Sequence, residues 1–309
     1  MRAISQSAFG GPDVLRLIDV DPPAPGPGEV QIQVSAAGVN PADWKARACL
    51  LGHPMTDPFI LGLDVAGPVS ATGPGVSAFS VGDAVFGFTA PPRGAYAEVA
   101  VAAARALAPA GGLDPVMAAA LPIAGLTAWQ PLVRVARVRP GQRVLVHAAA
   151  GGVGHLAVQI AKSLGAYVIG TARTGKHDYL RELGADELVD YTRVDFAAEL
   201  RGIDVVIDPL AEDYGPRSLD VLAPGGVLID VRGTGPDRAE VTALAAARGL
   251  RFVRFGVERT GDDLRPLAEL VTSGAVRVDV GQTLPLADAA KAHELLQSGR
   301  TRGKIVLLP

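Results

Sequence analysis

A glycine-rich loop constrains the fold of this chain more than any other segment. Residues 149–154 read Ala-Ala-Gly-Gly-Val-Gly, one substitution from Gly-x-Gly-x-x-Gly, with Ala149 at the first glycine position. The loop follows an apolar predicted strand, 143–148, and precedes a segment, 153–164, whose apolar residues recur at helical spacing. A strand, such a loop and a helix predict a dinucleotide site, because the helix N-terminus offers unpaired N–H groups to a pyrophosphate. The residues expected to contact the cofactor are Ala150, Gly151, Gly152, Val153 and Gly154. A tight turn that binds nothing is the alternative.

The end of the next predicted strand, 167–171, indicates which dinucleotide would bind. Sites for NAD usually place Asp or Glu there, roughly 20 residues after the loop, to accept from the ribose hydroxyls. This chain has no acid at that point and instead carries Thr171, Arg173 and Lys176. Two cations and a hydroxyl suit a 2′-phosphate. We therefore predict NADPH, with ordinary solvated charges as the alternative for Arg173 and Lys176.

The rest of the chain predicts two domains of different architecture, as its length of 309 residues also suggests. Short β-branched segments near the N-terminus predict an antiparallel barrel: 14–20, 29–36, 65–72 and 84–88. Beyond about residue 121, strands alternate with helices, which predicts a doubly wound parallel sheet. Its six strands are expected at 143–148, 167–171, 187–190, 204–208, 226–231 and 250–255, and an apolar strand at 304–308 ends the chain. We expect an α/β fold with a catalytic barrel domain in 1–120 and 268–309 and a Rossmann-type NADPH-binding domain in 121–267.

Charge and cysteine content narrow the possible partners and the compartment. Lys plus Arg (29) nearly balance Asp plus Glu (32), and no segment concentrates basic residues on one face, so a nucleic-acid or lipid partner is not expected. The single cysteine, Cys49, cannot form an internal disulfide, and a four-cysteine zinc site is impossible. The N-terminus has no continuous apolar segment typical of a leader. These features predict a soluble cytoplasmic protein.

Further motifs are distributed over nearly the whole chain. They lie at residues 10–15, 25–30, 37–45, 62–67, 81–83, 94–98, 125–129, 183–186 and 301–306. Together with the loop, they resemble the zinc-independent quinone oxidoreductase branch of the medium-chain dehydrogenase/reductase superfamily. The resemblance implies a first domain related to the chaperonin-10 (GroES-like) fold and a cofactor in the interdomain cleft. It also implies that Thr127 lies near the nicotinamide, and that Asn40, Tyr191, Phe255 and Lys304 line the cofactor site.

Two positions depart from the zinc alcohol dehydrogenases of the same superfamily. Those enzymes carry Cys where this chain has Asn40, and Gly-His-Glu where it has Gly62, Leu63 and Asp64. Neither thiolate nor imidazole is present at these places to hold a catalytic zinc. We therefore expect no metal.

Four residues are candidates for the substrate side. Asn40, which precedes Pro41, is expected to donate to the nicotinamide or a substrate carbonyl, or else to stabilise a turn. Trp44 and Phe86 are candidates for an apolar lid and wall, with core packing as the alternative, especially for Phe86. Lys45 either hydrogen-bonds a developing enolate or is an inert exposed charge. Of the histidines, we expect His147 and His155 to be structural, and His53, His177 and His293 to be surface residues.

These features predict hydride transfer from NADPH to a quinone or to the C=C bond of an α,β-unsaturated carbonyl compound. An enoyl-thioester reductase of a biosynthetic pathway is the enzymatic alternative. A non-catalytic NADPH-binding sensor or nucleic-acid binder is the other. The last predicted strand, Leu250–Phe255, would expose an apolar edge, so we also expect a homodimer that pairs through it.

Overall fold

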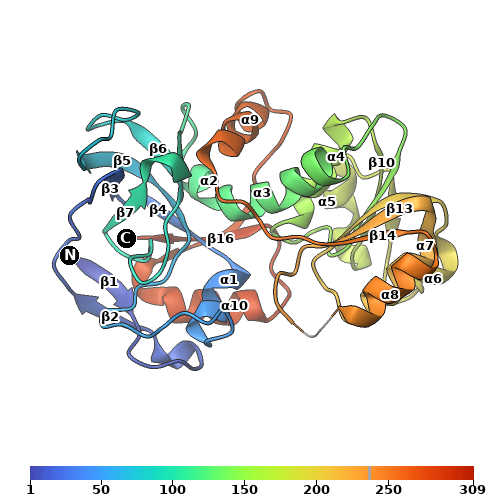
Figure 1. Cartoon of the computed structure of the whole chain (residues 1–309), viewed down its shortest axis with the longest axis horizontal. Coiled ribbons are helices and arrows are strands. Elements are labelled where there is room, and N and C mark those ends of the chain that lie inside the picture. The colour runs from blue at the N-terminus through green and yellow to red at the C-terminus, as the bar shows by residue number, and fades with distance from the viewer. Residues whose placement is uncertain (236–237) are drawn as a thin grey trace. The chain divides into compact units, whose positions relative to one another are not determined.

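The computed structural model describes residues 1–235 and 238–309, which pack into two units (Figure 1). We call them the barrel unit (Met1–Leu126, Glu258–Gly274 and Val278–Pro309) and the sheet unit (the described part of Thr127–Val257, and Ala275–Arg277). This division differs from the expected boundaries, because 121–126 and 258–267 belong to the barrel unit. Gly261, at the start of helix α9 (Gly261–Thr272), explains part of the difference. A Cβ there would lie 2.0 Å from the carbonyl oxygen of Leu107, so α9 packs directly on strand β8 (Leu107–Pro109).

The barrel unit is built from short strands joined by turns and a few helices. Strands β1 and β2 pair with each other antiparallel, and the remaining strands form one sheet in the order β15-β16-β4-β5-β3-β7, with β6 pairing to β5 and β8. The remaining strand bounds are β1 Arg2–Ser5, β2 Arg16–Asp19, β3 Glu29–Gln33, β4 Ala36–Val39, β5 Asp64–Thr72, β6 Ala84–Phe88, β7 Val99–Ala103, β15 Val280–Pro285 and β16 Lys304–Leu308. The remaining helices are α1 Pro41–Arg47, α2 Pro115–Ala120 and α10 Ala289–Gln297, with short turns at Pro12–Val14, Ala104–Ala106 and Leu286–Asp288.

The last strand of the chain completes this barrel. β16 pairs antiparallel with β4, which places Ile305 opposite Val39, and it pairs parallel with β15 on its other side. The core behind these strands contains buried Val, Ile, Leu and aromatic side chains from both ends of the sequence, among them Ile4, Phe59 and Leu307. The β4–β16 pairing therefore joins segments separated by more than 250 residues.

The sheet unit is a parallel sheet with helical crossovers. Its strand order, β11-β10-β9-β12-β13-β14, is the doubly wound order expected from the sequence. The strands are β9 Arg143–Val146, β10 Tyr167–Thr171, β11 Glu187–Val189, β12 Ile203–Asp208, β13 Leu222–Asp230 and β14 Arg251–Arg254. The helices are α4 Gly154–Ser163, α5 His177–Glu182, α6 Phe196–Glu199, α7 Tyr214–Val221 and α8 Ala239–Ala247, with a π-helical turn at Pro131–Val135 and a 3-10 turn at Thr174–Lys176. Helix α3, Pro122–Gln130, spans the point where the chain passes from one unit to the other.

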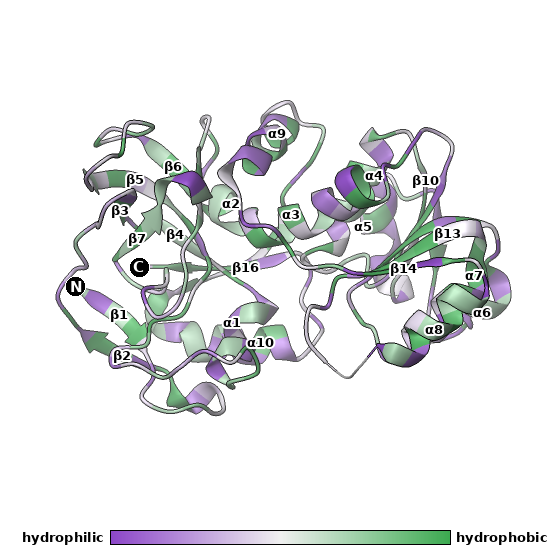
Figure 2. Ribbon diagram, viewed as in Figure 1, coloured by the Kyte–Doolittle hydropathy of each residue, from purple (hydrophilic) through white to green (hydrophobic). Residues whose placement is uncertain are grey.

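Hydropathy follows this architecture (Figure 2). The central strands are continuous apolar runs, as expected for a parallel sheet buried on both faces, and Val144, Leu145 and Val206 are fully buried. Helix α4 alternates apolar and polar faces along its length in Figure 2 and packs against β9 and β10. Among the described residues, no helix combines the length and apolar character needed to cross a bilayer.

Candidate cofactor and active site

The glycine-rich loop connects β9 to α4, as the sequence predicts. A Cβ on Gly154 would lie 2.4 Å from the Ala148 carbonyl oxygen, so only glycine fits there. Ala149 is fully buried, and its N–H donates to the Thr171 carbonyl at 3.1 Å, which accommodates alanine at the first glycine position. No side chain caps α4, and the N–H groups of Gly152 and Val153 have no partner among the described residues. Unpaired N–H groups at a helix N-terminus are suited to a phosphate.

The cations expected at the end of β10 lie in a turn held by an aspartate. The Arg173 Nε donates to the hydroxyl of Tyr191 at 3.3 Å, which brings two of the predicted cofactor residues together. The side chain of Lys176, half-buried, makes no ion pair with the described part of the chain. Asp190 accepts hydrogen bonds from the side chains and backbone N–H groups of Thr174 and Thr192. Hydrogen bonds from Thr174 first and then Thr192 hold the pKa of Asp190 well below its usual range. Sequence reasoning missed Asp190.

Thr171 differs from its expected role. Its side chain is 1% exposed, lies 3.2 Å from His147 Nδ1 and accepts from the backbone N–H of Ala148. The hydroxyl therefore supports the start of the loop from inside, and it is not placed to meet a phosphate in solvent. His147 is structural as expected: burial first and then Arg217 lower its pKa to about 3, and its ring packs against Phe196 and Tyr214.

In the barrel unit, the Asn40 amide is held at both ends. Its Nδ2 donates to Asp64 Oδ2 at 2.8 Å, and its Oδ1 accepts from the Lys304 ammonium, which also donates to the Val39 carbonyl at 2.9 Å. Asp64 also accepts from the Ile123 N–H at 3.1 Å. Burial raises the pKa of Asp64 to about 6 and lowers that of Lys304, although their opposite charges partly offset both shifts. These contacts determine the positions of Oδ1 and Nδ2 in the Asn40 amide. The second N–H of Nδ2 remains as a donor.

A second buried chain of hydrogen bonds begins three residues later. Asp43 Oδ2 accepts from the Asn40 N–H at 2.7 Å and from the Tyr96 hydroxyl at 3.1 Å. Tyr96 lies 3.2 Å from His293 Nε2, and Arg47 lies 3.1 Å from His293 Nδ1. Because arginine can only donate, the His293 Nδ1 accepts and its Nε2–H donates to Tyr96, so all donors point toward Asp43. Burial raises the pKa of Asp43 to about 7 and lowers that of His293 to about 3.

Several expectations for the barrel unit are corrected by this geometry. His293 is fully buried, not a surface residue, and Lys45 is 8% exposed with its ammonium 5.8 Å from the Trp44 ring centre. Phe86 is fully buried in β6 between the partner positions Ala66 and Ala108, so it is a core residue and not an exposed substrate wall. Trp44, on α1, is half-buried.

Thr127 and Phe255 are the remaining predicted cofactor residues. Thr127, on α3, is 7% exposed. Phe255 follows the last residue of β14, is half-buried, and donates its N–H to the Asp230 carbonyl at 2.8 Å. Phe255 therefore lies at the carboxyl edge of the parallel sheet, the same edge as the glycine-rich loop.

Known proteins are similar to this chain in both sequence and fold. The alcohol dehydrogenase GroES-like domain family matches residues 26–112, and the zinc-binding dehydrogenase family matches residues 183–307. A quinone oxidoreductase of Lama guanicoe is 37% identical over 100% of this chain and 97% of its own length. The chain belongs to the quinone oxidoreductase family, within the medium-chain dehydrogenase/reductase superfamily.

Two further similar proteins extend the comparison. A 2-haloacrylate reductase of Burkholderia sp is 36% identical over 97% of this chain and 96% of its own length. The structure of Escherichia coli quinone oxidoreductase complexed with NADPH superimposes with a TM-score of 0.92 and 32% identity, covering 100% of each chain. The expected α/β fold, with its GroES-like domain and Rossmann-type sheet, is thereby confirmed.

One of the two matching families is described as zinc-binding, which raises the question of whether this chain has side chains that could hold zinc. Among residues 1–235 and 238–309, no three His, Cys, Asp or Glu side chains gather as a metal-binding group. Asn40 and Leu63 stand where zinc dehydrogenases carry ligands, and the carboxylate of Asp64 instead accepts from Asn40 and Ile123.

Proposed function

We propose that this protein is an NADPH-dependent reductase that transfers hydride to a quinone or to the C=C bond of an α,β-unsaturated carbonyl compound. The observation that carries the proposal is the cation pair Arg173 and Lys176 after β10, in a stretch, residues 172–176, that contains no Asp or Glu. Asp178, the acid nearest to this turn in sequence, pairs with Arg181. The oxygens of Asp190, which holds the turn, already accept from Thr174 and Thr192. The relatives are named for quinone and 2-haloacrylate reduction, which supports the same reaction class.

The residues of the sheet unit fit a dinucleotide phosphate. The unpaired N–H groups of Gly152 and Val153 can donate to the pyrophosphate, and glycine at position 154 keeps the backbone close to the loop. Arg173 can remain bonded to Tyr191 while its guanidinium offers further N–H groups to the 2′-phosphate. Bound NADPH would supply the hydride from carbon 4 of its nicotinamide ring.

The residues of the barrel unit would orient the acceptor and stabilise charge. Asp64 and Lys304 hold the Asn40 amide so that its remaining N–H is a fixed donor, and a fixed donor costs no reorganisation as charge develops on a substrate oxygen. The ammonium of Lys304 lies behind Asn40 Oδ1 and polarises that amide further. The half-buried indole of Trp44 is an apolar surface suited to a flat conjugated substrate.

Steady-state kinetics with both cofactors tests the assignment of Arg173 and Lys176. Arg173→Ala or Lys176→Ala should raise the KM for NADPH by roughly ten-fold, with the KM for NADH nearly unchanged, because NADH has no 2′-phosphate. Arg181→Ala is the matched control, since Arg181 is an exposed arginine on the following helix that pairs with Asp178. If neither Arg173→Ala nor Lys176→Ala changes the preference between NADPH and NADH, these two cations do not bind the 2′-phosphate.

The acceptor is tested by following NADPH absorbance with a 1,4-quinone, a 2-alkenal, a cyclic enone and an enoyl thioester. Faster turnover of the quinone or of a free enone supports the proposal. Faster reduction of the thioester would instead favour a biosynthetic enoyl reductase. Tight NADPH binding with no turnover of any acceptor would favour a sensor.

The proposal includes a homodimer and a cytoplasmic location. β14 is the outermost strand on its side of the described sheet, and pairing of two copies through it would satisfy its open backbone groups. The single, exposed Cys49 supports a reducing compartment, where disulfides do not accumulate.

A further inference from the structure

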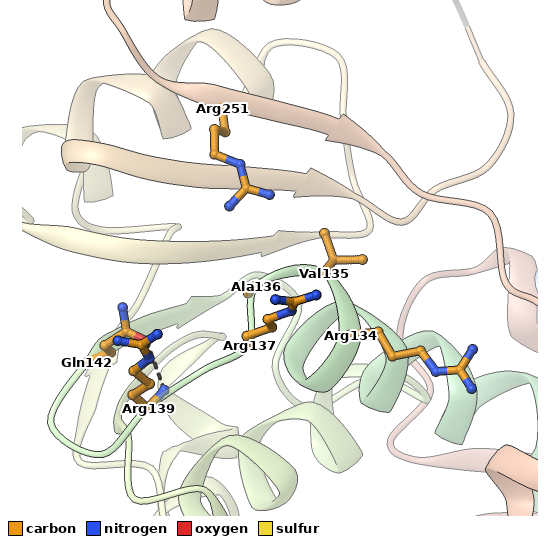
Figure 3. A pocket seen from close by; sticks show the side chains of 7 residues that line it. All are labelled: Arg134, Val135, Ala136, Arg137, Arg139, Gln142 and Arg251. Atoms are coloured by element: carbon orange, nitrogen blue, oxygen red, sulfur yellow. Dashed lines mark hydrogen bonds between the residues drawn. The ribbon is translucent and has the colours of Figure 1, made fainter.

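A pocket in the sheet unit is lined mainly by arginines (Figure 3). It has a volume of about 550 Å³, and four of its seven lining residues are Arg134, Arg137, Arg139 and Arg251. Gln142 adds a polar side chain, and none of the described residues that line the pocket is Asp or Glu. In Figure 3, Arg251 extends from β14 toward the segment that carries Arg137. The pocket is therefore a concave and strongly cationic surface on a chain with a net charge of -3.

Local backbone structure gathers these arginines at one place. The π-helical turn Pro131–Val135 ends just before Arg137, whose φ of 52° lies in the left-handed region and turns the chain sharply. The N–H of Arg139 donates to Gln142 Oε1 at 2.9 Å, which closes the next turn. β14 begins at Arg251, and β9 begins one residue after Gln142.

The pocket is separate from the glycine-rich loop. Both β9 and β14 begin beside it, so it lies at the amino edge of the parallel sheet. The glycine-rich loop follows the carboxyl end of β9 and lies at the opposite edge. A ligand in the arginine pocket would therefore not occupy the proposed pyrophosphate site.

Three of the guanidinium groups have no counter-charge in the structure. Arg137, Arg139 and Arg251 are exposed, and their side chains make no ion pair or hydrogen bond with residues 1–235 or 238–309. Arg143 and Arg248, which adjoin the same strands in sequence, pair instead with Glu187 at 3.6 Å and Asp220 at 2.6 Å. Like charges around one cavity repel each other, and an anion in the cavity would relieve this repulsion.

We propose that this pocket binds a small molecule that carries two or more phosphate groups. Guanidinium groups bind phosphate through paired N–H donors, and several of them around one cavity match a ligand with several charges. The volume lies within the range of roughly 300 to 1,000 Å³ typical of small-molecule sites. No aromatic side chain lines the pocket among the described residues, so it lacks the stacking surface on which single-stranded nucleic acids usually bind.

Calorimetric titration with inorganic tripolyphosphate at about 0.15 M salt tests the proposal. The unaltered protein should bind one tripolyphosphate at least ten-fold more tightly than orthophosphate. The double variant Arg137→Gln/Arg251→Gln should lose at least ten-fold in affinity, and Arg300→Gln, an exposed arginine of the barrel unit, should lose none. The two altered side chains are exposed and make no ion pair or hydrogen bond with residues 1–235 or 238–309. The variant should therefore keep the melting temperature of the unaltered protein when no ligand is present.

Four outcomes would overturn the proposal. One is tripolyphosphate binding no tighter than orthophosphate, and another is unchanged affinity in the double variant. The third is loss of binding in Arg173→Ala with full binding in Arg137→Gln/Arg251→Gln, which would place the anion at the cofactor site and leave the proposed function intact. A polyglutamate peptide that binds this pocket more tightly than tripolyphosphate would identify an acidic protein partner instead and would also contradict the inference.

Discussion

The fold strongly changes the acidity of Asp43. One carboxylate oxygen accepts from Asn40 and Tyr96, whereas the buried Oδ1 has no partner in the described part of the chain. Burial is the main cause of its raised pKa, and the nearby charge of Asp64 adds to it. An unpaired buried carboxylate oxygen makes the charged form costly. Asp43 therefore favours the proton in the folded chain.

This predicts a pH-dependent stability difference between the unaltered protein and Asp43→Asn. The folded pKa of about 7 exceeds the ordinary 3.8, so between these values the folded chain binds more protons at Asp43 than the unfolded chain does. The stability contributed by Asp43 must therefore fall as pH rises toward 7. Relative to the unaltered protein, Asp43→Asn should gain between about 1 and 4 kcal/mol from pH 4 to pH 8, at about 1.4 kcal/mol per pKa unit. Urea unfolding of both proteins at several pH values measures the gain.

The buried histidines do not obscure that measurement. The lowered pKa values of His147 and His293 make the stability of both proteins rise with pH between about 3 and 6.5, opposite in sign to the effect of Asp43. This contribution is common to both proteins and cancels in their difference. A difference that stays constant from pH 4 to pH 8 would show that Asp43 is already ionised at the low end.

At the scale of single residues, the sequence predicts which residue types could form a site better than it predicts whether each residue is buried. Arg173 and Tyr191, both predicted to contact the cofactor, are hydrogen-bonded to each other. Lys45 and His293 were expected to be exposed because charged and polar residues usually are, and both are buried. His293 accepts a hydrogen bond from Arg47, 246 positions away, and no local sequence pattern predicts such a contact.

Among the secondary-structure elements, β14 is one of the described strands with an open edge. It pairs with β13 on one side, with Phe252 opposite Leu228, and no described strand pairs with its other side. Arg251 and Arg254 stand at its two ends, and charges at the ends of an edge strand discourage indefinite pairing. The edge is suited to one closed, twofold contact.

We therefore predict that Val253→Lys converts a dimer into a monomer. Val253 is half-buried at the centre of β14, and two lysines brought together across a twofold axis would repel each other. Light scattering at micromolar concentration should give twice the chain mass for the unaltered protein and once the chain mass for the variant. Arg254→Lys, which keeps the charge, should remain dimeric. A mass of one chain for the unaltered protein would refute the dimer.

The sequence predicts elements best where periodicity is local. The strands β6 and β10 occupy the residues expected for them, and all six strands of the parallel sheet were anticipated, because apolar runs alternate regularly with helices. Strand β4 was not separated from β3, and β15 was not recognised, because β15 has only half-buried and exposed residues. Neither hydrophobic periodicity nor turn residues predict the pairing of β16 with β4, because both signals are local in sequence.

For the molecule as a whole, we predict activity without zinc. The candidate positions hold Asn40, Leu63 and Asp64, and the Asp64 carboxylate is bonded to Asn40 and Ile123. Purified protein should contain much less than one zinc per chain by elemental analysis, and its activity should persist in EDTA. One tightly held zinc per chain, lost together with activity in EDTA, would contradict this reading.

The pairing of β16 with β4 also governs the order in which the molecule can assemble during synthesis. All six strands of the parallel sheet lie between residues 143 and 254, so they leave the ribosome while β16, at Lys304–Leu308, is still to be made. Until then β4 lacks its partner on one side, and the buried residues Ile305 and Leu307 are missing from the barrel core. The barrel unit, whose first strands are synthesised before the sheet unit, is therefore completed after it. Until β16 is synthesised, the N-terminal strands of the barrel unit keep apolar surface exposed.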